Sequence, residues 1–97
     1  MKKQLLIFIL MLLPMVASAA GVEIDGIYYK LNSKDKEAEV SVNPNKYTGS
    51  VVIPETVTYN GRIYSVTSIG SIAFQFCSDL TSITIPNNIK TIGVHAF

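Results

Sequence analysis

The sequence predicts a mainly β protein, built as a truncated solenoid of about two turns that follows an N-terminal β-hairpin cap. Three observations lead to this prediction. From Val22 onward, short runs of alternating apolar and polar residues are separated by turn residues, which is the pattern of strands. The pairs Asp25-Gly26 and Asn60-Gly61 stand between such runs, as they do in tight hairpins. The second half of the chain repeats itself at a fixed, short period, which is typical of stacked repeat proteins.

Residues 1–19 have the pattern of a signal peptide. Lys2-Lys3 supply a positive start, the apolar run Leu5–Leu13 follows, and small residues stand at positions 17–19. A membrane anchor or a buried helix fits a run this short poorly, because a membrane-spanning helix needs about 20 apolar residues. We therefore predict a signal peptide over residues 1–19, cleaved between Ala19 and Ala20. The exported chain is not expected to span a membrane.

The composition of the rest of the chain, residues 20–97, excludes several classes of function. The chain of 97 residues has 8 basic and 7 acidic residues. Two of the basic residues, Lys2 and Lys3, belong to the predicted signal peptide, so residues 20–97 have 6 basic and 7 acidic residues and are nearly neutral. It has no basic run, so nucleic acid is not an expected partner. One cysteine, Cys77, excludes an internal disulfide framework, and a buried, unreactive thiol is expected there. With a single histidine no Cys/His metal cluster can form.

No pattern of catalytic residues stands out. His95 is the only histidine, and the chain has no Gly-x-Ser-x-Gly element. Cys77 and His95 are conceivable as nucleophile and base, but His95 occupies a variable position of the Ile-Gly-x-x-Ala-Phe element, where Ile72 is its counterpart. There is also no calcium-binding loop of the EF-hand kind and no Gly-rich phosphate loop. We predict that the protein is not an enzyme and that it has no catalytic, cofactor-binding or metal-binding residues.

Residues 20–47 are predicted to form the N-terminal β cap. Val22–Ile24 and Ile27–Leu31 flank the turn at Asp25-Gly26, and 38–42 alternates again before Asn43–Asn45 ends it. Ile27, Tyr29 and Leu31 share one face at period two. The tyrosines and charges of this segment are compatible with a binding patch. A small antiparallel sheet with one solvated face is the simpler interpretation.

Residues 48–97 are predicted to form the repeats, incomplete at the C-terminus. The segment 66–74 recurs at 89–97, so that Ile69, Gly70, Ala73 and Phe74 return as Ile92, Gly93, Ala96 and Phe97. Ser50–Pro54 returns as Ser82–Pro86, a longer offset than that of the first pair. The additional residues fall around Asn60-Gly61, which predicts a hairpin insertion at 55–65. Gly93 is expected to permit a tight bend.

These motifs resemble the BspA-like, or Treponema pallidum-type, leucine-rich repeat. Its repeat reads approximately L-x-x-I-x-I-P-x-x-V-x-x-I-G-x-x-A-F-x-x-C-x-x, and residues 66–97 follow this order and spacing. Residues 50–54 match the Ile-Pro element, and 22–47 resemble the usual N-terminal cap of the family. Ile72 and Phe76 depart from the pattern by being large and apolar, and we expect the cap or the inserted hairpin to cover them.

The pattern divides the repeat residues between a core and a solvent-facing surface. The predicted repeat core consists of Ile53, Ile69, Phe74, Cys77, Leu80, Ile83, Ile85, Ile89, Ile92 and Phe97. The outward strand residues form the candidate protein-binding face and are Ser50, Val52, Thr81, Ser82 and Thr84. The alternative is that these five residues are merely well suited to a solvated strand.

The resemblance implies a location and a function. Members of this family are typically secreted or cell-surface proteins of bacteria, and several are adhesins. We therefore expect an exported, leucine-rich-repeat protein-binding module, with an extracellular protein or cell-surface ligand as partner and adhesion to host matrix proteins or other cells as its specific role. The alternative is a structural solenoid spacer that carries another domain. Because the sequence stops just after an Ala-Phe element, further repeats are expected in a longer chain.

Overall fold

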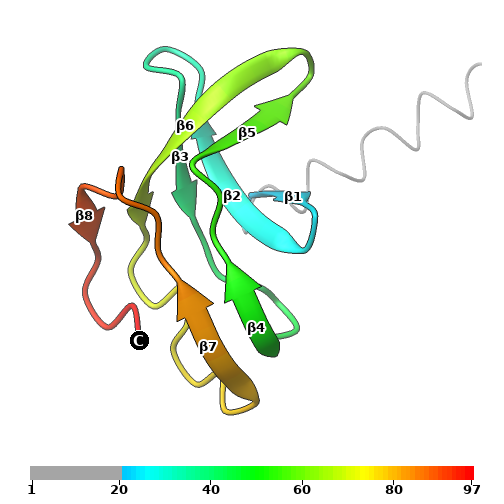
Figure 1. Cartoon of the computed structure of the whole chain (residues 1–97), viewed down its shortest axis with the longest axis vertical. Coiled ribbons are helices and arrows are strands. Elements are labelled where there is room, and N and C mark those ends of the chain that lie inside the picture. The colour runs from blue at the N-terminus through cyan, green and yellow to red at the C-terminus, as the bar shows by residue number, and fades with distance from the viewer. Residues whose placement is uncertain (1–20) are drawn as a thin grey trace, which may run out of the picture.

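A computed structural model describes residues 21–97, and these form strands, turns and loops without a helix (Figure 1). The strands are β1 (Val22–Ile24), β2 (Ile27–Asn32), β3 (Glu37–Val40), β4 (Gly49–Val52), β5 (Thr56–Tyr59), β6 (Arg62–Ile69), β7 (Leu80–Thr84) and β8 (Thr91–Ile92). The mainly β prediction is therefore confirmed for the described residues. In this part of the chain no helix could cross a bilayer. The predicted signal peptide and its cleavage at Ala19 and Ala20 lie outside the described residues.

Two sheets make up the fold. The larger has six strands in the order β1-β2-β3-β6-β5, with β8 paired to β6, and the smaller consists of β4 and β7. The pairs β1–β2, β2–β3 and β5–β6 are antiparallel, whereas β3–β6, β6–β8 and β4–β7 are parallel. Figure 1 shows β4 and β7 side by side, pointing the same way. The cap strands thus join the same sheet as the return strands of the repeats.

Both predicted hairpins are present, and their turns explain the residues that form them. Asp25 and Gly26 have φ values of 51° and 90°, and Asn60 and Gly61 have 52° and 78°. Two consecutive positive φ values define the type I′ turn, whose twist matches that of antiparallel strands. Asp, Asn and Gly tolerate this conformation best. Local turn chemistry therefore determines where β1–β2 and β5–β6 fold back.

The sequence offsets of the repeat reappear as the register of the parallel strands. Ser50 pairs with Ser82 and Val52 with Thr84, so the two copies of the Ile-Pro segment lie in register. Ile69 pairs with Ile92, so the two copies of the Ile-Gly element do the same. Equivalent residues of successive turns therefore lie directly beside one another, as stacking in a solenoid requires.

One aromatic residue from each turn contributes to a continuous stack. The ring centroids of Tyr47 and Phe74 are 4.7 Å apart, with a tilt of 39° between the rings. Those of Phe74 and Phe97 are 5.5 Å apart, and the rings are nearly parallel at 5°. These separations lie within the range of favourable aromatic pairs. We call Tyr47, Phe74 and Phe97 the aromatic ladder.

The predicted repeat core is buried only where a following turn covers it. Ile53, Ile69 and Phe74 are 2%, 1% and 3% exposed, whereas Ile85, Ile92 and Phe97, their counterparts one turn later, are 40%, 50% and 58% exposed. The expectation that these last three residues are buried therefore differs from the structure. The reason is that β7 and β8 have no strand on their outer side among the described residues. The remaining members, Cys77, Leu80, Ile83 and Ile89, are half-buried against the core.

Gly93 has a different role from the one expected. It does not have a positive φ, so it is not needed for a tight bend. A Cβ at this position would lie 2.5 Å from the backbone nitrogen of Ser71. The Gly93 N–H donates to the Ile69 carbonyl at 2.8 Å, and the Gly70 N–H donates to the Val40 carbonyl at the same distance. The glycine of the Ile-Gly element thus allows two successive turns to approach closely.

The two departures from the family pattern are not covered as expected. Ile72 is 47% exposed and Phe76 is 77% exposed in the part of the chain that the structure describes. Both have positive φ, 57° and 62°, which turns their side chains outward at the corner between two strands. A positive φ is unfavourable for a β-branched residue such as Ile72. This corner therefore combines backbone strain with exposed apolar surface.

Candidate binding surface

The small parallel sheet presents all five predicted face residues to solvent. In β4 the side chain of Val51 is buried, while its neighbours Ser50 and Val52 are exposed. In β7, Leu80 and Ile83 are half-buried, while the other three residues are exposed. Alternation along a strand places one set against the core and the other against solvent. We call Ser50, Val52, Thr81, Ser82 and Thr84 the strand face.

Four members of the strand face lie in direct cross-strand pairs, and the fifth does not. The hydroxyl oxygens of Ser50 and Ser82 are 2.9 Å apart and share a hydrogen bond. Val52 lies opposite Thr84. The register shifts by one residue after Gly49, so that Thr81 has no partner in β4. Thr81 is therefore a bulge residue, and bulges turn side chains away from the regular direction of the face.

A hollow of about 290 Å³ borders the strand face on the side of the cap. Ser50 and Val52 line it together with Lys46 and Tyr47 from the preceding loop. The Nζ atom of Lys46 lies 5.8 Å from the centroid of the Phe76 ring, which is near the outer limit of a cation–π contact. Lys46 and Phe76 thus extend the surface beyond the strand face. The sequence pattern did not assign Lys46 and Phe76 to the candidate binding surface, although Phe76 departs from the repeat pattern by its size.

Tyr47 anchors the loop that precedes β4. Its hydroxyl donates to the carbonyl of Ser41 at 2.7 Å and accepts from the backbone N–H of Tyr28 at 3.0 Å. Burial disfavours the phenolate and raises the pKa of Tyr47 to about 12. Burial also raises the pKa of Tyr29. Both phenols therefore stay neutral at physiological pH, and Tyr47 holds the floor of the hollow through a satisfied hydrogen-bond network.

The residues considered for chemistry occupy structural positions. Cys77 is a half-buried free thiol whose Sγ lies 3.9 Å from the carbonyl of Gln75. His95 is exposed at a corner, with φ 56°. No hydrogen bond joins the two side chains within residues 21–97, and that segment contains no group of His, Cys, Asp and Glu arranged for a metal ion. The absence of an enzymatic role remains a prediction.

Comparison with known proteins agrees with this geometry. Residues 63–97 match a family described as "BspA type Leucine rich repeat region (6 copies)". Among solved structures, the chain is similar to a leucine-rich cell surface protein from Faecalibacterium prausnitzii A2-165, with 28% identity and a TM-score of 0.65. It is also similar to a leucine-rich repeat protein from Bacteroides ovatus ATCC 8483, with 35% identity and a TM-score of 0.66.

Both alignments cover 78% of this chain but 20% of the other protein. The chain therefore spans about a fifth of the length of these solved structures. No curated protein matches it. The motifs, the in-register parallel pairing and these similarities agree: residues 63–97 are a leucine-rich repeat region of the BspA type.

Proposed function

We propose that the chain belongs to a secreted or cell-surface bacterial protein and serves there as a protein-binding module, with adhesion to host matrix proteins or other cells as its role. The strand face is the observation that carries this proposal. The predicted export signal over residues 1–19 and the similar cell surface protein from Faecalibacterium prausnitzii support the location. Further repeats in a longer chain are part of the proposal.

The strand face has physical properties that suit protein recognition. Its side chains are short, so a partner's backbone can approach closely and little side-chain entropy is lost on binding. Val52 is 63% exposed and adds apolar surface beside the hydroxyls. Each additional turn would add one more strand to this face, so the contact area would grow with the number of repeats.

One observation favours the alternative of a structural spacer. Ser50 and Ser82 already bond to each other, which leaves their hydroxyls with less capacity for a partner. A spacer would need only a regular, solvated face and would not depend on what its side chains are. Substitutions that change this face without disturbing the core distinguish the two functions.

The test places charge on the strand face. A Val52→Lys/Thr84→Lys variant introduces two lysines on neighbouring strands, and Thr56→Lys/Thr58→Lys introduces two on β5 as the matched control. All four positions are exposed. Surface plasmon resonance on immobilised collagen, laminin and fibronectin measures binding, and circular dichroism verifies the fold.

If the strand face binds protein, the first variant loses at least about tenfold in affinity, because two unpaired charges must be desolvated. The control keeps the affinity of the unmodified chain. Equal affinities of the unmodified chain and both variants would reject the role of this face and favour the spacer. Absence of binding to all three matrix proteins and to cultured epithelial cells would reject the adhesive role.

A further inference from the structure

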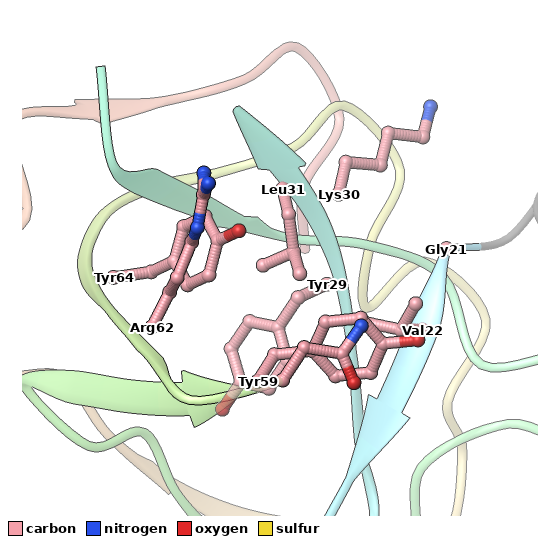
Figure 2. Close-up of a pocket in the computed structure, with 9 residues that line it drawn as sticks. Gly21, Val22, Tyr29, Lys30, Leu31, Tyr59, Arg62 and Tyr64 are labelled. Atoms are coloured by element: carbon pink, nitrogen blue, oxygen red, sulfur yellow. The ribbon is translucent and has the colours of Figure 1, made fainter. Parts of the chain in front are cut away.

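A cavity that lies away from the strand face is lined by residues of the cap and of the inserted hairpin. It has a volume of about 650 Å³ and lies between the β1–β2 hairpin and the β5–β6 hairpin (Figure 2). β1 and β5 are at opposite ends of the strand order, yet both line the cavity. The large sheet therefore curls until its two ends face each other. The volume lies in the range of about 300–1,000 Å³ that is typical of small-molecule sites.

Aromatic side chains from both hairpins line this cavity. Tyr59 lies directly opposite Arg62 in the antiparallel register, and Tyr64 follows Arg62 by two positions, on the same face of β6. Figure 2 shows these residues together with Tyr29 and Leu31 of β2, which line the same cavity. Tyr29 and Tyr64 are buried, whereas Tyr59 is 36% exposed at the mouth. Three of the five tyrosines of the chain thus gather at one site.

The cavity carries a positive charge that no carboxylate among residues 21–97 neutralises. Arg62 is exposed and forms no ion pair within residues 21–97. Lys30 also borders the cavity, but in Figure 2 its amino group points away from the other side chains. None of the described residues that line the cavity is Asp or Glu. A guanidinium in this setting favours an anion, and its planar donors match a carboxylate.

The shape and the polarity of the cavity together define its ligand. The ring of Tyr59, the exposed one of these three tyrosines, offers a face to a flat apolar surface. Its phenol and the amide of Asn60 offer partners for hydroxyls, and the guanidinium of Arg62 offers a partner for a carboxylate. A sugar ring offers an apolar C–H face bordered by hydroxyls, and a uronic acid adds the carboxylate. We propose that the cavity between the two hairpins binds an acidic sugar residue. This site is separate from the strand face, and the proposal does not depend on the function proposed for that face.

The experiment titrates the ¹⁵N-labelled protein with sodium D-glucuronate and follows the amide signals by NMR. D-Glucose tests the need for the carboxylate, and sodium benzoate tests whether any flat carboxylate suffices. Glucuronate should shift the amides of Val22 and Tyr59–Tyr64, with a Kd at least about tenfold below that of glucose, because glucose lacks the charge-assisted hydrogen bond to Arg62. Its Kd should also lie below that of benzoate, because benzoate has the carboxylate but lacks the hydroxyls. The shifts should weaken as salt is raised, because ions screen exposed charges.

Two variants with the same change of charge locate the interaction. Arg62→Gln should raise the Kd for glucuronate by about tenfold, whereas Lys34→Gln, in the exposed β2–β3 turn, should leave it unchanged. Arg62→Lys keeps the charge but loses the planar donors, and it should give an intermediate Kd. The proposal is overturned if glucuronate causes no shift, if glucose or benzoate binds as tightly, or if both Gln variants behave alike. These outcomes leave the test of the strand face unaffected.

Discussion

The aromatic ladder should contribute more to stability at its centre than at its outer end. Phe74 is 3% exposed and stacks on Tyr47 on one side and on Phe97 on the other. Replacing a buried Phe by Ala typically costs about 3–5 kcal/mol in the free energy of unfolding. Phe74→Leu keeps most of the volume but removes two aromatic pairs at about 0.5–1.5 kcal/mol each, or about 1–3 kcal/mol in all. We expect losses in these ranges for the two variants.

Phe97→Leu is the matched control, because the same substitution removes a single aromatic pair from a ring that is 58% exposed. Its expected loss is at most about 1.5 kcal/mol. Urea unfolding followed by far-ultraviolet circular dichroism measures all three variants. A loss for Phe74→Leu no larger than that for Phe97→Leu would refute the idea that the stack joins the turns. So would a loss below about 1 kcal/mol for Phe74→Ala.

Three further predictions concern the corners between turns. Gly93→Ala should lower the free energy of unfolding by about 1–3 kcal/mol, because the new methyl group meets the backbone of Ser71; an unchanged urea midpoint would contradict the close approach. Since burial raises the pKa of Tyr47 from 10.0 to about 12, its contribution is complete below pH 10 and is lost as the pH rises to about 12. In the Tyr47→Phe variant, the melting temperature should therefore fall less steeply between pH 10 and pH 12 than in the unmodified chain. If it falls equally steeply in both proteins, ionisation of Tyr47 is not the cause of the fall. Ile72→Asn should raise the free energy of unfolding by about 1 kcal/mol in the same urea assay, because Asn tolerates φ 57° better than Ile, and destabilisation would show that Ile72 packs more than its exposure indicates.

The parts of the fold that follow from local chemistry could be predicted from the sequence. Asp25-Gly26 and Asn60-Gly61 form tight turns because few other pairs accept two positive φ values. The repeat offsets agree with the register of the parallel strands, because equivalent positions of successive turns pair directly. The strand face followed from the same periodicity. Alternation alone decides which side chains of β4 point outward.

Features that depend on contacts between distant segments could not be predicted in this way. Ile85 and Ile53 occupy the same position in the repeat, yet only Ile53 is buried, and its N–H donates to the carbonyl of Thr84 in the following turn at 3.0 Å. Thr81 is an exposed member of the strand face without a partner in β4, because it lies at a bulge that no residue pattern indicates. The cavity between the two hairpins depends on how strongly the large sheet curls. Curling is a property of the whole sheet and has no signature in the spacing of Tyr29 or Tyr64.

The stacking of turns begins earlier in the chain than the repeat motif indicates. Val40 accepts from the Gly70 N–H as Ile69 does from the Gly93 N–H, and β3 pairs in parallel with β6 as β6 does with β8. Tyr47 then takes the place in the aromatic ladder that Phe74 takes one turn later. The sequence conceals this turn because Val40 and Tyr47 are farther apart along the chain than Ile69 and Phe74 are.

The cap therefore has two parts. The segment from β3 to Tyr47 takes the place of a first turn of the solenoid without the repeat motif, and the β1–β2 hairpin covers the end of the large sheet. On that side, β2 pairs with β3, β1 pairs with β2, and Val40 is fully buried. On the opposite side, Ile85, which follows β7, and Ile92 of β8 are exposed. A further turn stacked there would cover these two residues as β7 and β8 cover Ile53 and Ile69. The difference in burial between equivalent residues thus shows how much apolar surface one turn covers on its neighbour.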